Sequence, residues 1–106
     1  MDCERLRAIR AQVDVPLVIH GGSGLSPEDV RALISGGVTL FQMGTVMKKL
    51  FWEAAQQALT TCVGEPDCQA LVGSRRAGDF LLPGKAVVTE AVRGFMRLYG
   101  SAGKAD

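Results

Sequence analysis

Apolar residues recur along the chain in two rhythms, one typical of helices and one typical of buried strands. Residues 3–13 carry apolar side chains three or four positions apart with Arg and Glu between them, which predicts an amphipathic helix. Residues 17–19 are wholly apolar and mostly β-branched, and residues 38–43 form a second, longer and mostly apolar run. Both runs predict short strands of a parallel sheet, buried on both faces.

A helix with clear signals at both ends separates the two strands. Ser26 can act as N-cap, Pro27 suits the first helical position, and Asp29 stands where a capping box needs an acceptor. Gly36 and Gly37 end this helix. The sequence therefore predicts a strand, a crossover helix and a second strand.

The C-terminal half predicts helices. We expect a long helix at 46–62, a short one near 67–73, then loop, and a final amphipathic helix at 85–99, with residues 100–106 as a loose tail. Gly94 is expected to mark a close contact between helices. Five large apolar side chains are expected to serve packing: Met43, Met47, Phe51, Trp52 and Phe95.

The predicted order is helix, strand, helix, strand, helix, helix, and the crossover makes the strands parallel. Two such strands are too few for a complete sheet. The chain is either a small three-layer protein or the end of a larger α/β domain. The second is favoured, because nothing in the chain can pair with the outer strand edges.

Composition excludes several classes of partner. Lys and Arg number 12 against 11 Asp and Glu, which gives no electrostatic reason to expect nucleic acid or an anionic membrane. Basic pairs such as Arg75-Arg76 are read as solvated surface. No apolar run approaches the roughly 18 residues that a membrane span needs, and the charged N-terminus is unlike a signal peptide. Three cysteines without a CxxC pair indicate free thiols, and we expect a cytoplasmic protein.

The strongest chemical motif directly follows the first strand. His20 ends that strand, and Gly21, Gly22, Ser23 and Gly24 come next. A side chain at a strand end projects into the mouth of an α/β sheet, where a neutral imidazole is a common metal ligand. The glycines allow the backbone to approach an anion, and the Ser23 hydroxyl can bind a phosphate oxygen.

The end of the second strand repeats this arrangement. Alternation places Val38, Leu40, Gln42 and Gly44 on one side, and Thr45 follows before the next helix. Gln42 is expected to be a buried amide that meets either a ligand or a neighbouring loop. Two successive strand ends of this kind match the usual phosphate site of an eight-stranded α/β barrel.

Each candidate also has a structural alternative. His20 can be a structural histidine, Ser23 a turn residue and Gln42 a satisfied core amide. Thr45 can be a plain helix cap. Asp79, Lys85 and Glu90 have no motif around them and are assigned no role.

Residues 16–25 (PLVIHGGSGL) and 37–45 (GVTLFQMGT) resemble the last two strand ends of class II fructose- or tagatose-bisphosphate aldolases. The segments 2–10 and 99–105 are also similar to that family. The resemblance implies an α/β fold, the C-terminal part of a (βα)8 TIM barrel. The chain 1–106 then comprises two strand-helix units at 15–36 and 38–62. A C-terminal helical part at 65–99 and the loose tail at 100–106 follow.

The resemblance also implies a reaction and its residues. The family cleaves a ketose 1,6-bisphosphate reversibly to dihydroxyacetone phosphate and an aldehyde phosphate, in carbohydrate metabolism such as glycolysis. Zinc polarises the ketose carbonyl, and His20 takes the place of one of its three histidine ligands. The phosphate and substrate would be held by Gly21, Ser23, Gln42, Gly44 and Thr45. Some members of the family also bind a monovalent cation, which the resemblance places near the Gly21 backbone, and the family implies a homo-oligomer.

The chain departs from the family at the second strand. Gln42 stands where the family usually has Asn, Gly44 where Asp, Asn or Ala is frequent, and Leu40 where Lys is frequent. His20 is the chain's single histidine, whereas a catalytic zinc needs about three protein ligands. We therefore expect the 106 residues alone to be inactive.

Two other functions stay open: a non-catalytic remnant kept as a phosphate-binding or interaction module, and the phosphate-binding end of another barrel enzyme. An in-frame upstream extension carrying two strand-end histidines and an Asp would favour the aldolase. An authentic start at Met1 would favour the remnant.

Overall fold

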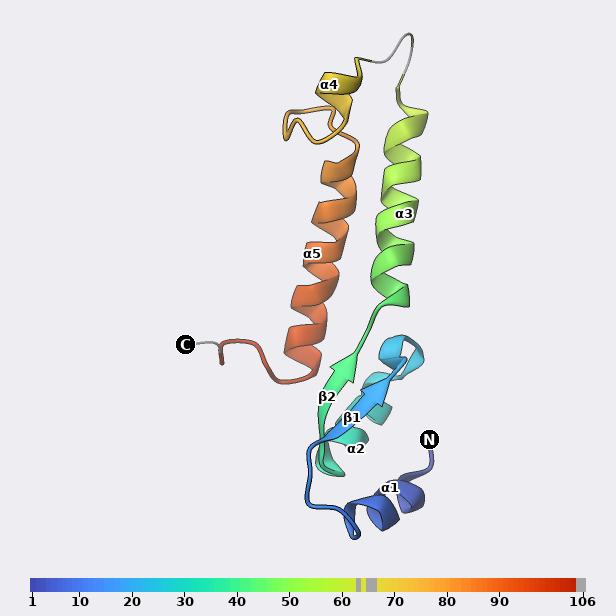
Figure 1. Ribbon diagram of the computed structural model, residues 1–106, viewed down its shortest axis with the longest axis vertical. Coiled ribbons are helices and arrows are strands. Elements are labelled where there is room, and N and C mark those ends of the chain that lie inside the picture. Colours follow the sequence, from blue (N-terminus) through green and yellow to red (C-terminus); the bar gives the residue numbers. More distant parts are fainter. Residues whose placement is uncertain (63, 65–66, 105–106) are drawn as a thin grey trace. The chain divides into compact units, whose positions relative to one another are not determined.

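The computed structural model describes residues 1–62, 64 and 67–104 (Figure 1). The chain divides into two compact units, one of Met1–Thr45 with the residues from Phe95 onward, the other of Val46–Gly94. The elements in chain order are α1 (Cys3–Arg10), β1 (Leu17–His20), the 3-10 turn η1 (Gly22–Gly24), α2 (Pro27–Ser35), β2 (Val38–Gln42), α3 (Thr45–Thr60), α4 (Cys68–Leu71) and α5 (Leu81–Leu98).

The two strands of the first unit pair in parallel, as predicted (Figure 1). An irregularity after Leu17 shifts the register once. The partners are then Val18 with Leu40, Ile19 with Phe41, and His20 with Gln42. The crossover helix α2 lies between them in sequence, so both strands end at the same edge of the sheet.

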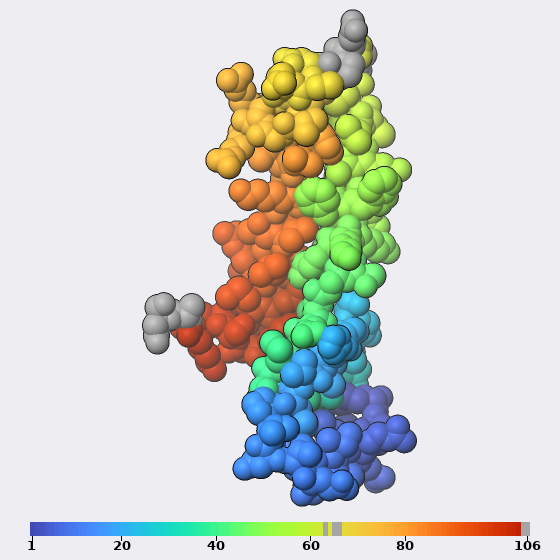
Figure 2. All heavy atoms as spheres, viewed as in Figure 1, coloured from blue at the N-terminus to red at the C-terminus, as the bar shows by residue number. Residues whose placement is uncertain are grey.

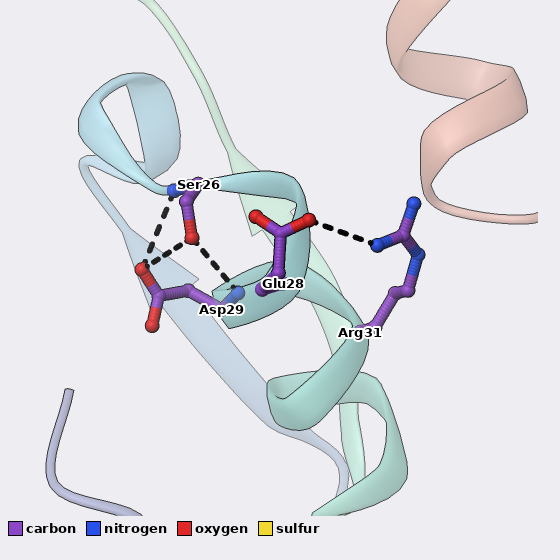
Figure 3. Close-up of polar contacts among 4 residues, drawn as sticks. All are labelled: Ser26, Glu28, Asp29 and Arg31. Atoms are coloured by element: carbon purple, nitrogen blue, oxygen red, sulfur yellow. Dashed lines mark hydrogen bonds and ion pairs between the residues drawn. The ribbon is translucent and has the colours of Figure 1, made fainter.

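The capping box predicted for α2 is confirmed (Figure 3). The Ser26 hydroxyl accepts a hydrogen bond from the Asp29 amide at 3.1 Å, and the Asp29 carboxylate accepts from the Ser26 hydroxyl at 2.8 Å. The hydroxyl bond lowers the pKa of the Asp29 carboxyl. Val30 and Leu33 of α2, together with Val38 at the start of β2, are buried. This small core holds the helix against the sheet.

One face of the sheet stays open to solvent. Val18 and Leu40, which are register partners, are 43% and 50% exposed. The prediction that the strands are buried on both faces is therefore wrong for this face within the described chain. Val38 does not share the exposure of Leu40 and Gln42, because it lies where the register shifts.

The first helix is shorter than predicted. It ends at Arg10 rather than near residue 13. The Arg10 guanidinium donates to the carbonyl oxygens of Val13 and Val15, at 3.3 and 3.0 Å. These bonds stabilise the non-helical connection into β1, since they satisfy carbonyls that no longer belong to a helix.

In the second unit, α5 begins at Leu81, four residues before the predicted start. Pro83 is compatible with this start, because an N–H in the first turn of a helix has no partner inside the helix. Gly84 is buried against the Phe51 ring of α3, where an added Cβ would lie 2.6 Å from the ring. Figure 2 shows the atoms of α3 and of this part of α5 lying against each other.

Two packing predictions for this unit are wrong. Gly94 has no heavy atom within 4 Å of an added Cβ, so Gly84 rather than Gly94 marks the close contact between helices. Trp52 is 66% exposed and does not serve packing within the described chain. Leu59 of α3 is also exposed, at 50%.

Asp79, which was assigned no role, is 3% exposed and organises the loop before α5. Its carboxylate accepts from the Arg75 amide at 2.8 Å and from the Leu81 amide at 3.1 Å. The Arg75 bond is the main cause of a lowered pKa of this carboxyl, which burial opposes. Arg75 itself adopts a left-handed conformation, with φ of 61°.

The remaining predicted boundaries differ by a few residues. α3 ends at Thr60, and the short helix spans Cys68–Leu71 with Asp67 as its N-cap. Residues 65 and 66, where the predicted C-terminal helical part begins, and residues 105 and 106 of the predicted tail lie outside the described residues. Across the described helices, none is long and apolar enough to cross a membrane.

Candidate functional site

His20 is the last residue of β1, and its register partner Gln42 is the last residue of β2. Register partners in a parallel pair project to the same face of the sheet. Both side chains are exposed, and neither makes a hydrogen bond within the described chain. The expectation that Gln42 is a buried amide is therefore wrong. Both groups are open to a ligand at this edge.

The residues after His20 form the glycine-rich turn. Gly21 adopts a left-handed conformation with φ of 71° and ψ of 27°, which a residue with a Cβ rarely adopts. The 3-10 turn Gly22–Gly24 follows, closed by the Leu25 amide donating to the Gly22 carbonyl at 3.3 Å. Ser23 is exposed, and its hydroxyl has no hydrogen-bond partner among the residues described. A reversal of this kind exposes consecutive amides to an anion.

The end of β2 is similarly open. Gly44 has no heavy atom within 4 Å of an added Cβ, and Thr45 is the first residue of α3. Both are exposed. The structure thus places His20, Gly21, Ser23 and Gln42 at one edge of the sheet, with Gly44 and Thr45 two and three positions beyond Gln42.

Phe41 and Tyr99, two aromatic residues that stack on each other near the turn, were not singled out by the sequence. The Phe41 ring of β2 stacks on the Tyr99 ring, with centroids 4.5 Å apart and planes at 12°. Phe95, one helical turn before Tyr99, stacks on it as well at 5.7 Å. The spacing of Phe95 and Tyr99 places both rings on one face of α5 and its extension. That spacing was the available signal.

Metal binding requires more ligands than the described residues bring together. Within residues 1–62, 64 and 67–104, no group of three or more His, Cys, Asp or Glu side chains could hold a metal ion. His20 is the single histidine of the sequence. Because a catalytic zinc takes about three protein ligands, these residues do not fit a zinc site by themselves.

A hollow in the first unit lies away from these residues. Its volume is about 620 Å³, and its lining comes from α1, the end of α2 and the glycines before β2. It therefore lies toward the edge where the strands begin, opposite His20. None of the candidate site residues contributes to it.

Comparison with known proteins gives two findings. The family model described as fructose-bisphosphate aldolase class II matches residues 1–104. The X-ray structure of the YdjI aldolase from Escherichia coli K12 is similar to this chain, with 26% sequence identity and a TM-score of 0.76. The match covers 97% of this chain and 34% of that aldolase. The chain therefore spans about a third of the length of this relative.

Proposed function

The chain belongs to the class II fructose-bisphosphate aldolase family and has the fold of part of its TIM barrel, and from this premise we propose that it supplies the phosphate-binding corner of a ketose-bisphosphate aldolase. The reaction is reversible aldol cleavage of a ketose 1,6-bisphosphate to dihydroxyacetone phosphate and an aldehyde phosphate. Its setting is carbohydrate metabolism in the cytoplasm, and the assembled enzyme is a homo-oligomer.

One observation carries the proposal: the left-handed Gly21 and the turn Gly22–Gly24 directly follow the strand-end His20. In this role the backbone amides of the turn and the Ser23 hydroxyl bind the phosphate group of dihydroxyacetone phosphate. Gly44 and Thr45 extend the same cradle from the second strand. The absence of side chains at residues 21, 22, 24 and 44 lets the backbone approach the phosphate oxygens.

His20 and Gln42 lie next to this cradle. In the proposed enzyme His20 is one ligand of a zinc ion, whose other ligands come from outside the described residues. Gln42, as its register partner, lies beside the carbon chain of the bound sugar phosphate and donates or accepts hydrogen bonds there. The exposed sheet face of Val18 and Leu40 is then covered by further strands of the barrel, as parallel sheets require.

The binding step can be tested on the chain itself. Inorganic phosphate or dihydroxyacetone phosphate is titrated into the isotopically labelled protein, and the amide shifts of residues 21–25 are followed. Ser23→Ala is expected to weaken binding about tenfold, because a hydrogen bond to a charged group is lost. Ser35→Ala is the matched control: Ser35 is also exposed but ends α2, away from the turn. Equal affinities of the two variants would contradict the proposal.

A second candidate function is a phosphate-binding module without catalysis. It is favoured by the finding that no three metal ligands come together in the part of the chain that the structure describes. A chimera separates the two functions. The third of the YdjI aldolase that matches this chain is replaced by residues 1–106, and aldol cleavage is measured with the substrates of the intact enzyme.

If this chain carries aldolase function, the zinc-loaded chimera is active and its His20→Ala variant is not. A folded, phosphate-binding chimera without activity would instead assign the chain to the non-catalytic module. The 106-residue chain alone is expected to show no activity and no sub-micromolar zinc binding through His20.

A further inference from the structure

The glycine-rich turn rests on a small cluster of side chains. Gly22 is buried, and an added Cβ would lie 3.7 Å from the Phe41 ring, 3.8 Å from Met43 Cγ and 3.8 Å from Leu25 Cδ1. These are ordinary packing distances. Phe41 and Met43 belong to β2 and the residue just beyond it, so the second strand forms the floor under the turn.

Tyr99 contacts both residues of this floor. Its ring stacks on Phe41, and its hydroxyl donates to the Met43 sulfur. Burial raises the pKa of the Tyr99 phenol, consistent with a ring enclosed by protein. Tyr99 thus contacts two of the three side chains nearest the Cβ position of Gly22, although it lies near the C-terminus and far from the motif in sequence.

The turn needs such a support. It has three residues, two of them glycines, and a single closing hydrogen bond of 3.3 Å. Glycine carries the largest conformational entropy in the unfolded or open state, so a turn of this composition opens easily unless packing restrains it. A cradle that must be ordered on binding holds its anion more weakly than one already formed.

We propose that Tyr99 is a positioning residue, which preorganises the Gly22–Gly24 turn for phosphate through Phe41 and Met43. The contribution to phosphate affinity rests on the proposed function, whereas the bracing of the turn does not. Tyr99 does not contact the ligand. It acts by holding the floor on which the turn lies.

The test compares local opening with ligand binding. Hydrogen exchange of the Leu25 amide, which closes the turn, is measured relative to the Val30 amide, which donates to the Ser26 carbonyl inside α2. Phosphate affinity is measured on the same samples. Tyr99→Leu is the main variant because it keeps bulk while removing the stack and the hydroxyl, and Tyr99→Ala is the stronger one.

Tyr99→Leu is expected to speed exchange of the Leu25 amide about tenfold with the Val30 amide changed less than twofold, and to weaken phosphate binding about fivefold. Tyr99→Phe keeps the stacked ring and is expected to retain most of the exchange protection of the Leu25 amide and most of the phosphate affinity. Leu33→Ala, in the core of α2, is the control for a general loss of stability and should speed exchange of the Val30 amide at least as much as that of the Leu25 amide, because Leu33 and Val30 are buried on the same helix.

A folded Tyr99→Leu variant with an unchanged exchange ratio overturns the proposal, and so does an equal change in Leu33→Ala. Tyr99→Leu can change the exchange ratio while neither Tyr99→Leu nor Ser23→Ala affects phosphate binding. In that case Tyr99 does stabilise the turn, and the proposed phosphate function fails. The two failures are thus distinguishable.

Discussion

His20 and Gln42 are register partners at the last paired position of β1 and β2, and both side chains are exposed on the same face. Neither side chain makes a hydrogen bond among the described residues. Groups placed side by side at a strand end without a structural partner are available for a ligand. This relationship favours the proposed ligand-binding role of His20 over a structural role, and the proposal can be tested directly.

His20→Ala is expected to change the free energy of unfolding by less than about 0.5 kcal/mol, as for exposed residues without partners. Urea denaturation of the 106-residue chain measures this. Gln42→Ala should behave in the same way. A loss above about 1 kcal/mol for His20→Ala would mean that the histidine stabilises the fold, and the structural alternative would stand.

The capping box predicts a stability loss at α2. Ser26→Ala removes the acceptor of the Asp29 amide and the donor to the Asp29 carboxylate, and loss of an N-cap is expected to cost about 1 kcal/mol. Ser35→Ala, at the other end of the same helix, is the control and should cost little. Equal effects of the two changes in urea denaturation would argue against the cap.

Replacing the two glycines of α5 by alanine is expected to have opposite effects on stability. Gly84→Ala places a Cβ 2.6 Å from the Phe51 ring, and this overpacking is expected to destabilise the chain by about 1–3 kcal/mol. Gly94→Ala meets open space and should stabilise it by about 0.5–1 kcal/mol, because alanine is the better helix former. Thermal denaturation of both variants checks the signs. Stabilisation by Gly84→Ala would contradict the described contact.

Asp79 predicts a dependence of stability on pH. Hydrogen bonds, first from the Arg75 amide, lower the pKa of its carboxyl in the folded chain. A carboxyl whose folded pKa lies below its unfolded pKa contributes stability above the unfolded value, about 4, and loses it as pH falls through the folded value. Asp29, whose pKa is lowered chiefly by the Ser26 hydroxyl, acts in the same direction.

Urea denaturation between pH 7 and pH 2 should therefore show stability falling below about pH 4. Asp79→Asn is expected to lower the free energy of unfolding at pH 7, because one amide loses its charged acceptor. The same variant is expected to make the fall in stability at acid pH less steep. Asp14→Asn is the control, since the Asp14 side chain is fully exposed. If Asp79→Asn leaves the fall in stability at acid pH unchanged, this role of the buried carboxylate is contradicted.

Local signals in the sequence determined much of this protein. The strand at residues 17–20, the cap at Ser26, the stop at Gly36 and the turn after His20 each depend on neighbours a few positions away. Short-range hydrogen bonding and backbone preference decide such features, so a single sequence contains them. The family resemblance depends on the same residues, and the match over residues 1–104 confirms it.

The tertiary structure decided what depends on distant partners. Whether a strand face is covered, whether Gly84 or Gly94 meets another helix, and whether Trp52 is buried all depend on which element lies opposite, and apolar periodicity is the same in either case. Asp79 gained its role from amides that only the folded loop brings together. The contact of Tyr99 with Phe41 and Met43 likewise joins the C-terminal end of the described chain to the floor of the turn. Burial and long-range contact are properties of the packed chain. For this reason the sequence indicated a candidate site, whereas only the structure showed which side chains pack near it.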